Sequence, residues 1–117
     1  MGTWGTGPFD NDDAAEFIGS LKADLGSKLQ DSRFSDDEGE RAEGRAALGA
    51  LTALHRAGYV VSPNAFDDGQ RLLETMLDDK MWISQWRSPA AIRSRLRNDL
   101  KENAKISAAL RRRFRRR

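Results

Sequence analysis

The C-terminal part of the chain gathers the side chains with the clearest chemistry. Between residues 93 and 117, eleven side chains are Arg or Lys, and only Asp99 and Glu102 are acidic. Guanidinium groups donate planar, bidentate hydrogen bonds to phosphate. The pattern therefore predicts a surface that contacts RNA, DNA or another polyanion. The predicted contact residues are Arg93, Arg97, Lys101, Lys105, Arg111, Arg112, Arg113, Arg115, Arg116 and Arg117, with Arg95 in the same run.

Six arginines fall within residues 111–117, and their mutual repulsion is relieved by an acidic partner. If all six met phosphates, log affinity would fall with log salt at a slope of about −5 for duplex DNA and about −4 for single strands. Such contacts position a protein without reading base sequence. The alternative is a solvated tail that folds over an acidic surface of its own or a neighbouring subunit.

The opposite end of the chain is acidic. Residues 1–40 carry a net charge of −7, residues 41–80 carry −1 and residues 81–117 carry +10, which together give the net +2. An acidic surface over residues 36–43 would attract a basic protein, because complementary charge steers association. The second functional hypothesis is therefore a protein-interaction module of the immunity or antitoxin kind, with Asp36, Asp37 and Glu40 as its contacts.

The first 14 residues, MGTWGTGPFDNDDA, combine glycines with acids and so raise the question of a ligand loop. Acidic residues stand where a phosphate would sit, and no Lys-Ser/Thr pair follows, which disfavours a phosphate loop. A calcium loop needs glycine at its sixth position and glutamate at its twelfth, where the chain has Ala15 and Leu21. A weak magnesium site and a myristoylation signal of the form M-G-x-x-x-[ST] are less favoured than a structural role.

No other cluster of residues favours an enzyme. His55 is the only histidine and cysteine is absent, so we expect no zinc site and assign His55 to packing or capping. Known nucleophile, zincin, kinase and dinucleotide motifs are missing, and we expect a non-enzymatic protein without cofactor or metal. Trp82 and Trp86, beside Arg87, suit either base stacking or core packing, and packing is favoured.

The spacing of apolar residues predicts four helices and no convincing strand. The first starts near Asp10 or Asn11 and carries a stripe from Phe17 to Leu29. The second is announced by a capping box at Ser35 to Glu38 and ends at Gly58. It is apolar over most of its circumference, which is typical of a central, closely packed helix. The third starts at Ser62-Pro63 and includes Trp82, and the fourth starts at Ser88-Pro89. In the fourth, Ile92, Leu96 and Leu100 are followed by Ile106, Leu110 and Phe114 on a different face.

The chain is thus expected to be an all-α, compact bundle of about four helices, with an extended Gly/Trp-rich N-terminal segment. Its 117 residues suit a single helical domain over 1–110 and a basic arginine tail over 111–117. The lack of cysteine fits a reducing compartment, and neither a membrane span nor a secretory signal is visible, so we expect a cytoplasmic protein. The sequence does not indicate an oligomeric state.

The N-terminal segment reads as a structural signature. Trp4 and Phe9 are apolar anchors separated by residues that permit tight turns, and they precede an acidic helix start. The pattern MGxWGxGxFxNDxA resembles the start of a bacterial family catalogued as domain of unknown function 4259. The resemblance is close over about 20 residues and weaker through the second and third helices. It implies a small, helical, cytoplasmic bacterial protein and supplies no activity. The residues that carry it are Gly2, Trp4, Gly5, Gly7, Phe9, Asn11 and Asp12.

Overall fold

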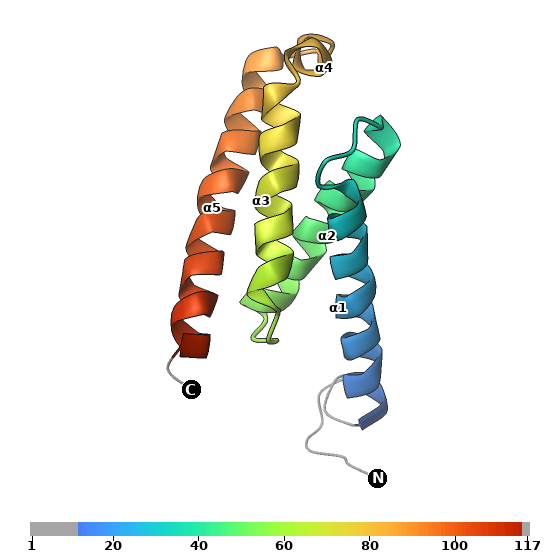
Figure 1. Cartoon of the computed structure of the whole chain (residues 1–117), viewed down its shortest axis with the longest axis vertical. Coiled ribbons are helices and arrows are strands. Elements are labelled where there is room, and N and C mark those ends of the chain that lie inside the picture. The colour runs from blue at the N-terminus through green and yellow to red at the C-terminus, as the bar shows by residue number, and fades with distance from the viewer. Residues whose placement is uncertain (1–11, 116–117) are drawn as a thin grey trace.

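Five α-helices form the part of the chain that the computed structural model describes, residues 12–115 with side chains through Phe114 (Figure 1). The helices are α1 (Asp12–Ser32), α2 (Glu38–Arg56), α3 (Pro63–Asp78), α4 (Lys80–Ser84) and α5 (Pro89–Arg115). No residue in this range forms a strand, which confirms the all-α class. The N-terminal motif from Gly2 to Asn11 lies outside the described residues, as do Arg116 and Arg117, and Asp12 is the first residue of α1.

The sequence analysis did not predict the short helix α4, because the apolar spacing assigned Trp82 to the third helix. The backbone leaves the helical region at Asp79, where φ is −86° and ψ is 81°. The Asp79 carboxylate then accepts a hydrogen bond from the Trp82 amide at 3.1 Å and caps a separate short helix. One residue therefore ends α3 and starts α4, and the apolar spacing carries no sign of this.

The start of α2 differs from the predicted capping box. Asp37, and not Ser35, is the N-cap, and its carboxylate accepts from the Glu40 amide at 2.9 Å. The Ser35 hydroxyl accepts from the Asp37 amide at 3.0 Å and donates to the Glu40 carboxylate at 2.6 Å. The box is thus wrong by two residues, because a carboxylate at Asp37 is an equally good cap and Ser35 supports it from outside the helix.

The predicted boundaries at Gly58, Ser62-Pro63 and Ser88-Pro89 are confirmed, while the helix start predicted near Asp10 or Asn11 lies outside the described residues. Gly58 has φ 98°, and it follows the α2 C-cap with the paired bonds Tyr59 N–H to Leu54 O and Gly58 N–H to His55 O, both 3.0 Å. This is the Schellman arrangement, which needs a left-handed residue. Ser62 caps α3 with Pro63 in its first turn, and the Ser88 hydroxyl accepts from the Ala91 amide at the start of α5.

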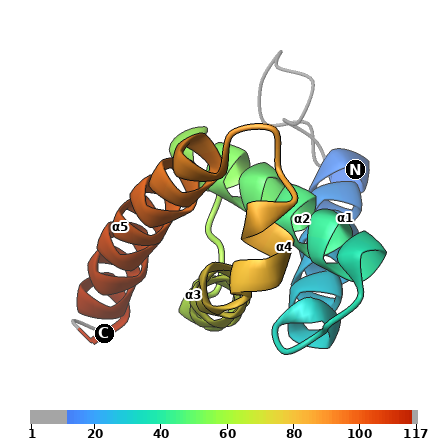
Figure 2. The ribbon, with the colours of Figure 1, turned by 90° about the horizontal axis from the view of Figure 1, so that it is seen from above.

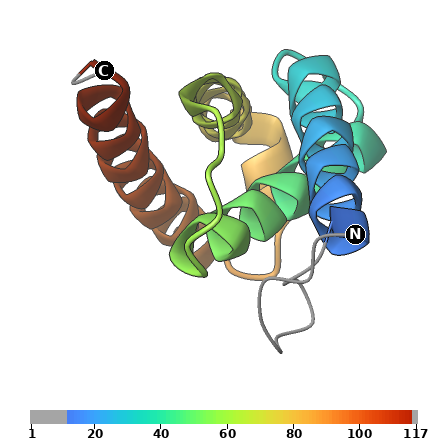
Figure 3. The same ribbon diagram turned by 90° about the horizontal axis from the view of Figure 1, so that it is seen from below.

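The central helix is α3, which contacts all four others, while α5 and α1 lie at opposite edges of the bundle (Figures 2 and 3). Phe66, Leu72 and Leu73 of α3 are fully buried in the apolar core. The sequence instead favoured α2 as the central helix. That expectation is wrong, because α2 buries Leu48 and Leu51 but leaves Ala42, Ala46, Gly49 and Ala53 exposed.

Candidate nucleic-acid interface

A single face of α5 packs against the bundle. It follows a spacing of three, four and seven residues, so the two predicted apolar stripes are in fact one continuous face, and Phe114 is exposed. Asn103 connects its two halves: its Nδ2 donates to Phe66 O at 2.6 Å and to Gln70 Oε1 at 3.0 Å. The buried members of this face are Ile92, Leu96, Asn103, Ile106 and Leu110.

A basic stripe runs along another side of the same helix. We define it as Arg93, Arg97, Lys101, Lys105 and Arg112, of which Arg93 is half-buried and the others are exposed. Four of them follow one another at every fourth residue, and Arg112 comes seven residues after the last, so all project from neighbouring positions of the helix surface. Steps of four residues exceed one turn of 3.6, so the stripe winds slowly around the α5 axis.

The stripe is almost free of acidic neighbours. Within the described residues, no carboxylate lies within ion-pair distance of Arg93, Arg97, Lys101 or Arg112, and Lys105 meets Glu102 only at 3.8 Å. The other predicted contact residues behave differently. Arg111 forms an ion pair and hydrogen bond with Asp67 of α3, which also accepts from Ser107 at 3.0 Å.

The remaining residues of the predicted interface are divided between the helix and the end of the chain. Arg113 is exposed and lies 18 residues, or five full turns, from Arg95, so both occupy one face of α5 away from the stripe. Because α5 extends to Arg115, residues 111–115 of the basic tail are helical. The side chain of Arg115 and all of Arg116 and Arg117 lie outside the described residues.

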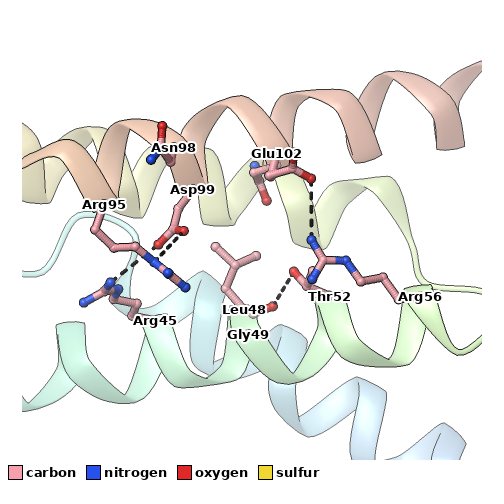
Figure 4. A pocket seen from close by; sticks show the side chains of 10 residues that line it. Arg45, Leu48, Gly49, Thr52, Arg56, Arg95, Asn98, Asp99 and Glu102 are labelled. Atoms are coloured by element: carbon pink, nitrogen blue, oxygen red, sulfur yellow. Dashed lines mark hydrogen bonds and ion pairs between the residues drawn. The ribbon is translucent and has the colours of Figure 1, made fainter.

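Both acidic side chains of α5 are directed toward α2, across a cleft of about 490 Å³ (Figure 4). Asp99 pairs with Arg45 of α2 at 3.5 Å and with Arg95 at 3.2 Å. Glu102 pairs with Arg56 of α2 at 3.5 Å. The arginines of α2 therefore neutralise the carboxylates of α5 on one side of the helix. Among the described residues, this arrangement leaves four of the five stripe cations without an ion pair.

The acidic surface over residues 36–43 is exposed apart from one residue. Arg41 is only 5% exposed; its Nε donates to Ser35 O and its Nη1 to the Asp79 carboxylate, both at 2.7 Å. The hydrogen bond from Arg41, and next the one from the Trp82 amide, holds the pKa of Asp79 below its ordinary value of 3.8. Arg41 thus fixes the α1–α2 link to the α3–α4 junction. The sequence analysis did not identify this role of Arg41, because a charged residue in an acidic segment is expected to be exposed to solvent.

An apolar groove of about 390 Å³ adjoins the acidic surface. Buried Met76 and half-buried Trp82 line it, together with the exposed residues Ala42, Ala46, Trp86 and Glu38. Trp82 packs on the core, and Trp86 meets it edge to face at a centroid distance of 5.5 Å. The packing role favoured for the tryptophans is therefore confirmed for Trp82, while Trp86 remains 42% exposed.

The other features considered are the single histidine, possible metal ligands and possible membrane spans. His55 is half-buried and packs edge to face on Phe66 at 6.1 Å, as its assignment to packing predicts. Residues 12–114 contain no group of three or more His, Cys, Asp or Glu side chains placed to hold a metal ion. No helix among the described residues is long and apolar enough to cross a bilayer.

The profile of the family described as "Domain of unknown function (DUF4259)" matches residues 2–112, nearly the whole chain. The chain belongs to the DUF4259 family. The match covers the N-terminal motif and the whole basic stripe, and it ends before Arg113. No curated protein and no solved structure shows significant similarity to this DUF4259 protein.

Proposed function

We propose that this DUF4259 protein binds RNA or DNA through the basic stripe of α5, without catalysing a reaction. The observation that carries the proposal is the segregation of charge on α5. Asp99 pairs with Arg45 of α2 and with Arg95 of α5, and Glu102 pairs with Arg56 of α2. Four of the five stripe cations make no ion pair within the described residues. A row of cations without internal counterions is a surface that phosphate groups stabilise.

The dimensions of the stripe suit a nucleic-acid backbone. From Arg93 to Arg112 the helix rises by about 28 Å at about 1.5 Å per residue. Along the axis of a duplex, each strand carries one phosphate per about 3.4 Å, so the stripe is as long as the axial rise of roughly eight phosphates. Arg113, Arg115, Arg116 and Arg117 extend the positive charge beyond the stripe, and Arg111 contributes less because Asp67 already holds it.

The test compares two triple variants with the same change in net charge. Arg97→Gln, Lys101→Gln and Arg112→Gln remove stripe cations, whereas Lys28→Gln, Arg71→Gln and Arg87→Gln remove exposed cations from other surfaces. Fluorescence anisotropy with labelled RNA and DNA oligonucleotides measures the affinity at fixed salt. We expect the stripe variant to bind at least about tenfold more weakly. Each phosphate contact that is lost reduces the number of counterions released on binding, and this release favours the complex. Equal weakening of both variants would contradict a role for the stripe.

A second function, capture of a basic protein, is favoured by the end of the bundle where α4 lies, away from the C-terminal end of α5. Phe34 is 69% exposed, Met81 75% and Trp86 42%, and the segments that hold them lie at the same end of the bundle (Figures 1 and 2). Large exposed apolar side chains beside an acidic surface are typical of protein interfaces. The partner that fits is a protein with an apolar side chain surrounded by Lys or Arg.

Photo-crosslinking from position 81 in the native host tests the second function. The expected product is a discrete adduct with a basic protein, and Asp36→Asn with Glu38→Gln should abolish it. These two residues are preferable to Asp37 and Glu40, which cap and stabilise the start of α2. An adduct that persists in the neutralised variant, or the absence of any discrete adduct, would count against this function.

A further inference from the structure

A second feature of the basic surface lies where the stripe begins. A shallow pocket of about 580 Å³ opens at the junction of three helices, where α4 lies across the end of α3 beside the start of α5 (Figures 1 and 2). Its lining residues are Leu77, Asp78, Lys80, Ile83, Arg93 and Arg97. Two of these, Arg93 and Arg97, are the first two members of the basic stripe, so the pocket and the stripe form one continuous surface.

The pocket concentrates positive charge from two helices. Lys80 comes from α4, while Arg93 and Arg97 come from α5, and Asp78 is the one acidic residue of the lining, which leaves a net charge of two. Within the described residues none of the three cations makes an ion pair. Arg93 is moreover half-buried. A partly desolvated guanidinium without a carboxylate partner is costly, and a bound anion would relieve that cost.

The inner surface of the pocket is apolar. Ile83 is 1% exposed and belongs to the core, and the partly buried Leu77 packs against the same core. An anion that enters beside these side chains is held against a nonpolar wall, where electrostatic attraction is stronger than in open water. This combination suits a phosphate ester whose attached group also contacts an apolar surface. It suits an inorganic anion less well.

We propose that this pocket binds the terminal phosphate monoester of a nucleic-acid strand whose backbone follows the stripe. The inference rests on the proposed nucleic-acid function and adds the strand end as its ligand. A terminal monoester carries a charge of about −1.5 to −2 at neutral pH, whereas each internal diester carries one negative charge. The net charge of two in the pocket matches the monoester. The pocket lies at the first cation of the stripe, which is where a strand that follows the stripe would end.

The experiment compares short oligonucleotides with and without a terminal phosphate, at the 5′ end and separately at the 3′ end. The pocket variant is Lys80→Gln with Arg93→Gln, and the control variant is Lys101→Gln with Arg112→Gln, which removes two stripe cations outside the pocket. Wild type should bind one phosphorylated form about tenfold more tightly, the scale of one or two charged hydrogen bonds. The control should bind all oligonucleotides more weakly and keep this ratio, while the pocket variant should lose it.

A ratio near one in wild type, or a ratio that survives in the pocket variant, overturns the inference and leaves the stripe function intact. NMR of the Ile83 methyl group during titration with a nucleoside monophosphate provides a readout that needs no strand binding. If strands do not bind but this methyl shifts in wild type and not in the pocket variant, the strand-end ligand is overturned and a free phosphate monoester takes its place. If neither response occurs, both the pocket and the stripe proposals are overturned.

Discussion

Asp79 joins three segments of the fold through one carboxylate. It accepts from buried Arg41 of α2 at 2.7 Å and from the Trp82 amide of α4 at 3.1 Å, directly after the end of α3. Asp79→Asn keeps a capping oxygen but removes the negative charge beside Arg41. We expect a lower free energy of unfolding at neutral pH in urea titrations. Asp78→Asn, one residue earlier and exposed, is the matched control and should change stability little.

The pH dependence of this loss has a definite sign. The pKa of Asp79 in the folded protein lies below its ordinary value of 3.8. The contribution of the carboxylate is therefore fully present above pH 3.8 and is lost as the pH falls through the lower folded-state pKa. The stability difference between wild type and Asp79→Asn should be constant at neutral and mildly acidic pH and should narrow below 3.8. A difference that widens on acidification would refute the role of the ion pair.

The buried side chain of Asn103 allows the opposite test, in which a substitution adds a negative charge to the buried face of α5. Its Nδ2 donates to two oxygens, and its Oδ1 is buried without a hydrogen-bond partner among the described residues. Asn103→Asp would place a carboxylate against Phe66 O and Gln70 Oε1, so we expect a loss of about 3 kcal/mol or more at pH 7. The loss should shrink at low pH, where the acid is protonated. Asn98→Asp, exposed on the same helix, should fold with near wild-type stability in the same thermal and urea measurements.

At the scale of elements, the contact between α1 and α2 depends on one glycine. A Cβ on Gly44 would lie 2.7 Å from Ser32 Cβ and 2.9 Å from Leu72 Cδ2, and would also clash with Ser32 Oγ. Gly44→Ala should therefore destabilise the protein by about 1–3 kcal/mol through overpacking. Gly49→Ala, in open space on the same helix, should stabilise it by about 0.5–1 kcal/mol because alanine favours a helix. Equal effects in differential scanning calorimetry would contradict this close approach.

The sequence predicted most helix boundaries because caps are local. Ser62-Pro63, Ser88-Pro89 and Gly58 each act within a few residues, and each is found where expected. The choice between Ser35 and Asp37 as cap, and the break at Asp79, depend on Glu40, Arg41 and Trp82 in their folded positions. Periodicity alone cannot place such partners. This is why α4 and the α2 cap were misassigned.

The candidate interface was only partly visible in the sequence. The basic composition of residues 93–117 singled out α5, but it could not separate Arg97 and Lys101, which form no ion pair within the described residues, from Arg111, which Asp67 of α3 holds. That distinction depends on which face of α5 meets α3 and α2. The pocket beside Lys80 depends on the break between α3 and α4, which no sequence pattern indicated.

At the scale of the whole molecule, the C-terminal end of α5 is separated from the acidic surface near the start of α2. The described end of α5 lies at the other end of the bundle from the start of α2 and the acidic surface over residues 36–43 (Figure 1). Because α5 is helical through Arg115, it directs the basic C-terminal region away from that surface. Folding of the tail over these acids of its own chain is therefore disfavoured, and the positive charge is available to another molecule.

The salt dependence of nucleic-acid binding tests this account most directly. If the four stripe cations that form no ion pair within the described residues each meet a phosphate, they contribute a slope of log affinity against log salt of about −3.6 for duplex and about −2.8 for single strands. Replacing Arg97, Lys101 and Arg112 with Gln should flatten the duplex slope by about 2.7. The matched variant at Lys28, Arg71 and Arg87 should keep the wild-type slope. A wild-type slope near zero, or equal flattening in both variants, would contradict the stripe as the nucleic-acid interface.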